Sequence, residues 1–346
     1  KADNTEVKGK ITIHRLSVPT HSNGMISQAY TFSVFAFFAL NVCRKIKPDF
    51  LIGTTSRLMT GVLTWISARF LRRKYYIDLR DIFSETISDL FALKNSFLSA
   101  FFRRLFSFLD KQVLNSAVGV NVVSEGFLEY FEKKGINTTN WSFFPNGVDE
   151  EFFSFALSVD ESSKKVKTIL YAGNIGSGQG LELVIPDIAK LLGLSYRFVI
   201  IGDGGAISLL RSAIQRDYIS NVELLPPVNR SELIKYYMGA DIMFLHLNNV
   251  PAFRRVLPSK IFEYAALKKP IVAGLSGYSA QFLKDHIPHA FLFESGDSKA
   301  GAACIFNAVD SQVSEEAVDK FVMMYSRLSI MDRMASQLMN IMESSQ

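Results

Sequence analysis

The stretch that decides the fold runs from Leu257 to Ala273 and reads LPSKIFEYAALKKPIVA. Pro258 ends a loop, Ser259 and Lys260 open a helix, and the apolar run after Pro270 is typical of a buried strand. A serine at a helix start caps free backbone N–H groups, and that end of a helix favours phosphate. Lys260 adds a positive charge where the helix dipole disfavours one, which indicates an anion beside it.

Glu263 lies one turn after Lys260, on nearly the same face of the predicted helix. A carboxylate beside a phosphate site indicates a ligand that carries hydroxyl groups near its phosphates, such as a nucleotide with its ribose. An ordinary capped amphipathic helix explains the same residues. The helix alone leaves both interpretations open.

Size and composition favour a folded protein of two domains. The chain has 346 residues, of which 48% are hydrophobic and 21% are charged, and this excludes a disordered protein. Cys43 and Cys304 lie far apart in apolar surroundings, which predicts thiols in a reducing compartment. The five histidines have no paired spacing, so no metal is expected. The polar opening, residues 1–9, has no signal peptide and indicates a fragment or a processed start.

Positive charge and phenylalanine concentrate in the first half of the chain. Residues 1–155 hold 19 Lys and Arg against 14 Asp and Glu, whereas the remainder holds 19 of each. Two stretches combine aromatic and basic side chains: Phe32, Phe35, Phe37 and Phe38 with Arg44, Lys45 and Lys47, and Phe97, Phe101, Phe102, Phe106 and Phe108 with Arg103 and Arg104.

Basic, aromatic, amphipathic helices of this kind lie on anionic membrane surfaces, so a membrane surface is an expected partner of the first domain. Core-facing helices of an α/β domain explain each stretch equally well. Nucleic acid is not expected as a partner, because the basic residues form no stripe and no binding motif is present.

Short apolar runs alternate with longer helical patterns along most of the chain. Expected strands of the first half are 11–16, 50–53, 75–78 and 118–123, and expected helices are 27–44, 59–70, 96–114 and 125–133. Expected strands of the second half are 168–172, 196–201, 222–225, 241–245 and 270–273, and expected helices are 181–191, 206–214, 230–238 and 259–267. Such alternation predicts an α/β protein with two Rossmann-like, doubly wound parallel sheets.

A polar, aperiodic stretch separates the two halves and gives the domain boundaries. We predict an acceptor-side domain over 1–150, a linker over 151–165, a nucleotide-binding domain over 166–312 and helices over 313–346 that cross back to the first domain. Open parallel sheets bind ligands at the carboxyl ends of their strands. Three features of the second half meet that condition: the loop Gly173–Gly180, the loop Gly202–Gly205 and the helix start at Pro258–Lys260. Glycines after strands are also simply turns.

The first half offers Arg80 and Asp81 at the end of an expected strand. Asp81 is interpreted either as the N-cap of a helix or as a carboxylate that faces a cleft between the domains. The segment Pro145–Asp149, which contains Asn-Gly, reads as a tight turn.

Taken together, these motifs resemble the family-4 retaining glycosyltransferases of the GT-B fold, over residues 8–345. The segments that carry the resemblance are PNGVD at 145–149, YAGNIG at 171–176, IGDG at 201–204, PVNRSEL at 227–233 and PSK…EY at 258–264. RDIFSE at 80–85 is similar to a segment of the bacterial WbuB-type O-antigen and capsule transferases.

The resemblance implies a nucleotide-sugar donor, no bound metal or other cofactor, and the following roles. Glu263 would bind the ribose, Ser259 and Lys260 would face the diphosphate, and Asp81 would lie near the anomeric carbon, beside Arg80 in the acceptor cleft. Catalytic roles fall on Asp81, Lys260 and Glu263. Further donor-binding residues would be Gly173, Asn174, Ile175, Gly176, Asp203, Pro227, Val228, Arg255 and Pro258.

Three departures from the family pattern stand out. Arg255 occupies the position of a glutamate that contacts the donor sugar in the family, so that Arg254 or Arg255 would meet phosphate instead. Asn174 and Gln179 stand where many members place Arg and Lys on the diphosphate, with Lys260 as the substitute. The first domain also lacks the family's first strand.

The implied function is transfer of a sugar, with retention, from a nucleotide donor such as a UDP-sugar to a lipid-linked saccharide. The enzyme would be a bacterial hexosyltransferase that makes O-antigen or capsule at the cytoplasmic face of the cell membrane. Two alternatives are a nucleotide-sugar-binding module without activity and a GT-B sugar-nucleotide epimerase.

Overall fold

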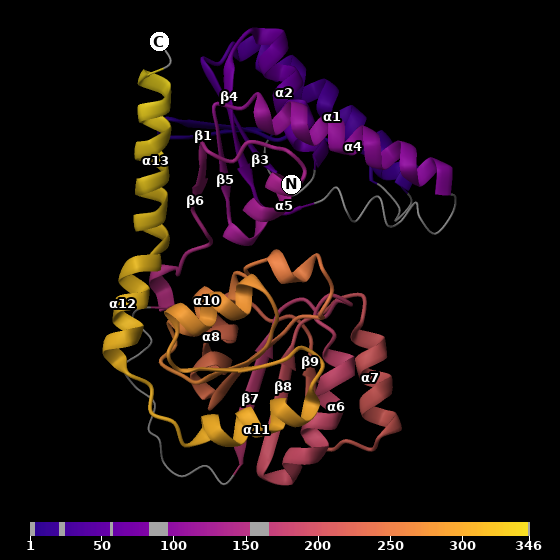
Figure 1. The fold of residues 1–346 in the computed structure, drawn as a ribbon, viewed down its shortest axis with the longest axis vertical. Coiled ribbons are helices and arrows are strands. Elements are labelled where there is room, and N and C mark those ends of the chain that lie inside the picture. Colours follow the sequence, from indigo (N-terminus) through magenta and orange to yellow (C-terminus); the bar gives the residue numbers. More distant parts are fainter. Residues whose placement is uncertain (1–3, 21–24, 56–57, 83–95, 153–165, 345–346) are drawn as a thin grey trace. The chain divides into compact units, whose positions relative to one another are not determined.

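The computed structural model describes residues 4–20, 25–55, 58–82, 96–152 and 166–344 (Figure 1). The chain divides into two compact units. One comprises Lys1–Asn121 with Lys134–Ser142, and the other comprises Val122–Lys133 with Phe143–Gln346. The predicted domain boundaries, and the predicted crossing of the last helices, stay predictions. Most of the predicted linker, 153–165, lies outside the described residues.

The first unit contains a four-stranded sheet in the order β3-β4-β5-β6. Its strands are β3 (Phe50–Thr55), β4 (Lys74–Leu79), β5 (Gly119–Val122) and β6 (Trp141–Phe143). Its helices are α1 (Met25–Ile46), α2 (Leu58–Leu71) and α4 (Ser96–Asn115), whereas α5 (Leu128–Lys133) and the 3-10 turn at Glu125–Phe127 before it belong to the second unit. Five of the six residues of β4 are buried, as expected of a parallel strand covered on both faces.

The predicted strand at 11–16 does not belong to this sheet. Strand β2 (Ile11–His14) pairs antiparallel with β1 (Thr5–Lys8), a strand that the polar sequence did not suggest. Gly9 makes the turn at a φ of 59°, a conformation that glycine adopts without strain. Because Ile11 is 63% exposed, this strand has no buried face that would hold it inside a doubly wound sheet. The expectation of a first parallel strand here was wrong.

The second unit contains a six-stranded parallel sheet in the order β12-β11-β10-β7-β8-β9. Its strands are β7 (Lys167–Ala172), β8 (Tyr196–Ile201), β9 (Val222–Leu225), β10 (Ile242–His246), β11 (Ile271–Gly274) and β12 (Ala290–Phe293). Its helices are α6 (Leu181–Leu192), α7 (Ile207–Arg216), α8 (Arg230–Gly239), α9 (Lys260–Ala265), α10 (Tyr278–His286), α11 (Ser298–Val309), α12 (Glu315–Tyr325) and α13 (Arg327–Glu343).

Successive residues of each central strand enter two different cores. Ile169 and Tyr171 of β7 join the core beneath α6 and α11, whereas Leu170 and Ala172 join the core beneath α8, α9 and α10. The strand order reverses between β7 and β10, because the chain builds outward from β7 to β9 and then from β10 to β12. Ligands of such sheets bind at the carboxyl ends of the strands beside this reversal.

Among the described residues, no helix is long and apolar enough to cross a membrane. Cys43 and Cys304 are free thiols of intermediate burial. The same residues contain no group of three or more His, Cys, Asp or Glu side chains suited to a metal ion.

Candidate functional site

Two glycine loops meet at the carboxyl ends of β7 and β8. Gly173 N–H donates to the Ile201 carbonyl at 2.8 Å, and Ile175 N–H donates to the Asp203 carbonyl at 2.8 Å. A Cβ on Gly202 would lie 1.8 Å from the Gly173 carbonyl oxygen, at a φ of 151°. Gly202 is therefore required for the close contact between the two loops. From the sequence alone, this structural role could not be distinguished from a role in ligand binding.

Lys260 of α9 reaches across Gly173 to the end of β7. Its Nζ donates to the Tyr171 hydroxyl at 3.0 Å and lies 4.6 Å from the centre of the Tyr171 ring. A Cβ on Gly173 would lie 2.2 Å from Lys260 Cε, so only glycine leaves room for this side chain. Burial lowers the pKa of Lys260 to about 8. The ammonium group is thus partly desolvated while its hydrogen-bond partner is a neutral hydroxyl.

Ser259 does not cap α9, contrary to the expectation from the sequence. Its side chain makes no capping hydrogen bond, and its backbone is already helical at φ −58° and ψ −29°. A capping serine needs an extended backbone to turn its oxygen toward the second and third N–H groups. The chain enters this turn through backbone bonds to the Pro258 and Ser259 carbonyls. Since α9 has six residues, Lys260 rather than a long helix dipole supplies the positive charge.

Glu263 lies one turn beyond Lys260 and is already hydrogen-bonded. Its Oε2 accepts from the Tyr237 hydroxyl at 3.0 Å, and its Oε1 lies 3.5 Å from an Arg230 nitrogen. Burial raises the pKa of Glu263, and the Tyr237 bond and the Arg230 charge oppose that rise. Arg230 also pairs with Asp149 and Glu151.

Sequence reasoning gave no role to Tyr237 or Arg230, although Arg230 lies in the segment 227–233 that carried the family resemblance. Their spacing from Glu263 along the chain gave no signal of the contact.

The loop after β7 is held by its own amides. Asn174 Nδ2 and Gly176 N–H both donate to Gln179 Oε1, at 3.0 and 3.1 Å. His246 Nδ1 lies 2.6 Å from the Gln179 carbonyl, while its Nε2 accepts from Gly296 N–H at 3.0 Å. This arrangement fixes one neutral tautomer, and burial lowers the pKa of His246. Asn174 and Gln179, which replace cations of the family pattern, therefore order the loop.

Arg255 has an aromatic partner. Its guanidinium carbon lies 4.5 Å from the centre of the Tyr130 ring, and its carbonyl accepts from the Ser124 hydroxyl at 2.5 Å. A phosphate contact for Arg255 or Arg254 stays a prediction. Asp203 accepts from the N–H of Gly204 at 2.7 Å, within its own loop. Pro227 is exposed and Val228 half-buried.

Arg80 and Asp81 follow β4 in the first unit. Arg80 Nε pairs with Asp78 at 2.8 Å, and Asp78 also accepts from Asn121 at 2.7 Å. One oxygen of Asp81 accepts from the N–H of Ile82 at 2.8 Å. Residues 83–85 of the RDIFSE segment lie outside the described residues. The role of Asp81 beside the donor stays a prediction.

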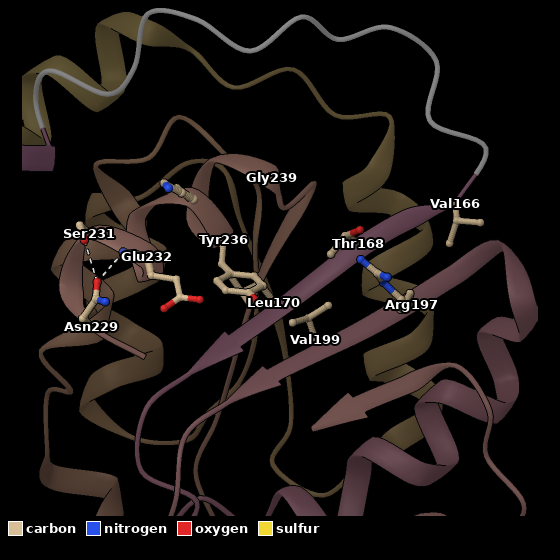
Figure 2. Close-up of a pocket in the computed structure, with 11 residues that line it drawn as sticks. Val166, Thr168, Leu170, Arg197, Val199, Asn229, Ser231, Glu232, Tyr236 and Gly239 are labelled. Atoms are coloured by element: carbon tan, nitrogen blue, oxygen red, sulfur yellow. Dashed lines mark hydrogen bonds between the residues drawn. The ribbon is translucent and has the colours of Figure 1, made fainter. Parts of the chain in front are cut away.

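A hollow of about 1020 Å³ opens elsewhere, on the sheet face beside α8 (Figure 2). Thr168 and Leu170 of β7, Arg197 and Val199 of β8 and Tyr236 of α8 line it. These strand residues precede the carboxyl ends where the glycine loops begin. None of the predicted site residues lines this hollow, so we place the candidate site at Lys260 and Glu263 instead.

Comparison with known families bears on the second unit. Residues 166–311 match the family model described as "Glycosyl transferases group 1". This match covers the sheet and most of the helices of the second unit and is a similarity to a group 1 glycosyl transferase domain. The domain contains both glycine loops, Lys260 and Glu263.

Two curated proteins are similar to the chain. One is the "Putative colanic acid biosynthesis glycosyl transferase WcaI" of Escherichia coli (strain K12), 25% identical over 257 residues, which are 72% of this chain and 63% of the relative. The other is the "Probable glycosyltransferase WbjE" of Pseudomonas aeruginosa, 24% identical over 269 residues, 73% of this chain and 64% of the relative. The chain thus spans less than two thirds of the length of either relative.

Solved structures show the fold. A sucrose-phosphate synthase from Thermosynechococcus elongatus is similar with a TM-score of 0.77 and 15% identity, over all of this chain and 87% of that chain. Anabaena HepE, solved in complex with UDP and glucose, is similar with a TM-score of 0.69 and 17% identity, over 92% of this chain and 84% of that chain. The chain has the GT-B fold, which confirms that prediction. The finer WbuB-type assignment stays a prediction.

Proposed function

We propose that this chain is a retaining glycosyltransferase that moves a sugar from a UDP-sugar to a lipid-linked saccharide. The group 1 domain and the two glycosyltransferase relatives support the class of reaction. The name of WcaI refers to colanic acid biosynthesis, and HepE was solved with UDP. These names favour a UDP donor and a surface polysaccharide as the product.

The observation that carries the proposal is Lys260 lying across Gly173 at the end of β7. Cleavage of the sugar–phosphate bond leaves negative charge on the nucleoside diphosphate, and stabilising that charge is the main electrostatic task of such a site. Lys260 is desolvated and bonded to a neutral hydroxyl. An arriving diphosphate would therefore bring this ammonium group negative charge beyond that of the nearby Glu263 carboxylate, and would raise its pKa.

Glu263 would orient the nucleotide instead of neutralising it. Its carboxylate oxygens accept from Tyr237 and lie near Arg230, so they are held in one orientation while lone pairs remain for the ribose hydroxyls. Tyr264, fully buried in the next position, fixes α9 to β7, because its hydroxyl accepts from the Ala172 N–H at 3.1 Å. Lys260 and Glu263 are therefore carried by a helix that is anchored to the sheet.

The acceptor side of the reaction belongs to the same proposal. We assign Asp81 to the reacting centre and a lipid-linked acceptor at the inner face of the bacterial membrane, as the family resemblance implies. The names of the two relatives do not state an acceptor substrate.

The proposal is tested by calorimetry with UDP and by transfer from labelled UDP-sugars to membrane extract. We expect saturable UDP binding and label in the lipid fraction. UDP binding without any transfer would favour the inactive binding module. Release of free, epimerised sugar without membrane extract would favour the epimerase. If calorimetry detects no binding of UDP, guanosine diphosphate or adenosine diphosphate, the proposed function is wrong.

A further inference from the structure

Three helices of the first unit form a layer over one face of its sheet. Helix α2 packs on β3 and β4 and also contacts α1 and α4. Figure 1 shows these helices together, in indigo to magenta. The solvent-exposed surface of these three helices is called the outer face. It consists of the exposed residues of α1, α2 and α4.

Large apolar side chains gather on the outer face. Among the described residues six phenylalanines are exposed, and five of them lie on these helices while Phe306 does not. Their exposed fractions are much higher than those of core residues, for example 63% at Phe37, 60% at Phe70 and 56% at Phe108. Further exposed apolar residues of the outer face are Tyr30, Phe38, Ile46, Met59, Ile66, Phe101 and Leu105.

The spacing places these residues in stripes along the helices. Met59, Ile66 and Phe70 of α2 are seven and four residues apart, and Phe101, Leu105 and Phe108 of α4 are four and three apart. Such intervals put side chains on one side of a helix. Core packing, which explained these stretches equally well from sequence, accounts for the half-buried Phe32, Phe35 and Phe106 but not for the exposed stripes. Soluble proteins rarely expose contiguous apolar patches unless something binds there.

Charge on the same helices has one sign. Their sequences contain six basic residues, Arg44, Lys45, Arg69, Arg103, Arg104 and Lys111, and one acidic residue, Asp110. Asp110 is buried and lies 3.6 Å from Lys134. The Arg44 guanidinium carbon lies 5.2 Å from the centre of the Phe70 ring, so aromatic and basic groups are neighbours on the outer face. A protein partner of ordinary composition would not require this uniform charge.

We propose that the outer face of α1, α2 and α4 binds the surface of an anionic phospholipid bilayer. The aromatic rings enter the boundary between headgroups and acyl chains, and the basic side chains lie among the phosphates, as in interfacial amphipathic helices. The proposal rests on the proposed function in one respect, since a lipid-linked acceptor gives the enzyme a reason to lie on the membrane. The binding itself requires neither donor nor acceptor.

The test is co-sedimentation of the chain with vesicles of phosphatidylcholine that contain about one third phosphatidylglycerol. We expect binding to these vesicles, less binding at high salt, and little binding to phosphatidylcholine alone. The triple variant Phe37→Ser, Phe70→Ser, Phe108→Ser should lose at least tenfold in partitioning. Its matched control, Leu194→Ser, Leu209→Ser, Phe306→Ser, changes three residues of similar exposure in the second unit and should bind like the parent chain.

A second pair of variants tests the charge. Each basic residue near an anionic surface is worth about fivefold in partitioning at low salt. Lys45→Gln, Arg69→Gln, Arg104→Gln should therefore weaken vesicle binding by about 100-fold. Arg211→Gln, Lys284→Gln, Lys299→Gln, which removes three exposed charges of the second unit, should not. Thermal melting of every variant checks that the fold is intact.

Two results would overturn the proposal. One is equal vesicle binding by each test variant and its control. The other is self-association of the chain through the outer face, seen by sedimentation velocity and abolished by the Phe triple variant, with no binding to vesicles. UDP calorimetry on the same samples keeps the two proposals apart. Vesicle binding without UDP binding would support the membrane-binding proposal and contradict the proposed function.

Discussion

Lys260 and Glu263 stand one turn apart on the same short helix, yet their surroundings differ in kind. The Lys260 ammonium meets a tyrosine hydroxyl and ring, whereas the Glu263 carboxylate meets a tyrosine hydroxyl and an arginine. The lysine is hydrogen-bonded to a neutral hydroxyl and interacts with the Glu263 charge one turn away, whereas the glutamate is contacted directly by Tyr237 and Arg230. The difference indicates that the lysine end of the site supplies affinity for an anion and the glutamate end supplies orientation.

The largest effect is expected for Lys260→Ala. A charge-assisted contact to a buried anion is worth about 1.5 to 3 kcal/mol, so UDP affinity should fall by about 100-fold. Calorimetry measures this directly. Lys284→Ala, on an exposed part of α10, is the matched control and should leave affinity unchanged. An unaltered UDP affinity in Lys260→Ala would take the lysine out of the site and end the comparison.

Gly173→Ala should also disturb the Lys260 end of the site, by steric exclusion and without a change of charge. The new Cβ would fall 2.2 Å from Lys260 Cε at a φ of 139°, so the lysine must leave its place over Tyr171. We expect a loss of UDP affinity of at least tenfold, with some loss of stability. Gly239→Ala, at the end of α8 and outside the candidate site, adds a Cβ that meets nothing within 4 Å and should bind UDP normally. Equal behaviour of the two variants would contradict the placement of Lys260.

Glu263→Gln tests the other end. We expect a loss of about fivefold in UDP affinity, since one charged acceptor becomes a neutral one. The sharper readout is 2′-deoxy-UDP. The parent chain should prefer UDP, and Glu263→Gln should lose most of that preference. A preference that survives the substitution would assign the ribose to another residue. Tyr237→Phe, which removes only the supporting hydroxyl, should give an intermediate result.

The depressed pKa of Lys260 predicts a pH dependence of binding. Free Lys260 loses its proton as the pH rises through about 8, and the diphosphate binds the protonated form. UDP affinity should therefore fall as the pH rises, by about threefold between pH 7.5 and 8.5. Calorimetry at several pH values measures the slope. Lys260→Ala should remove it, and a slope that persists in this variant would have another source.

The smallest effect on donor affinity is expected for Asp81→Asn. If this carboxylate acts at the reacting centre, the substitution should lower the turnover rate while UDP affinity stays within twofold, in accordance with a role limited to the transition state. Donor affinity and initial rates of transfer are both needed. A variant that loses affinity but keeps its turnover rate would move Asp81 out of the reacting centre.

The sequence predicted the second sheet well because its strands are short apolar runs, and the central ones are buried on both faces. Strands β8 (Tyr196–Ile201) and β9 (Val222–Leu225) begin and end at the predicted residues. Strand β12 and helices α10 and α11 were not predicted, although the sheet needs β12 as its edge beside β11. Strand β2 was predicted but assigned to the wrong sheet, because four alternating residues do not tell a hairpin from a parallel strand.

The chemistry of the site was less accessible. The spacing of Lys260 and Glu263 on one helix predicted their common face, since helical periodicity is local. The contacts that give each its character come from far along the chain, Tyr171 in one case and Tyr237 in the other. At Ser259 the local prediction itself was wrong. Serine is a favoured N-cap residue, but its backbone here is already helical and its side chain does not cap the helix.

The bonds inside the loop after β7 have a kinetic consequence. Gln179 receives two bonds from its own loop through its side chain and contacts His246 through its carbonyl, and Asn248 bonds to the Ser177 carbonyl. The loop is thus ordered before any ligand arrives, and little conformational entropy remains to be lost on binding. Association of a nucleotide would then be limited by diffusional encounter, and differences in affinity among nucleotides would appear in their residence times.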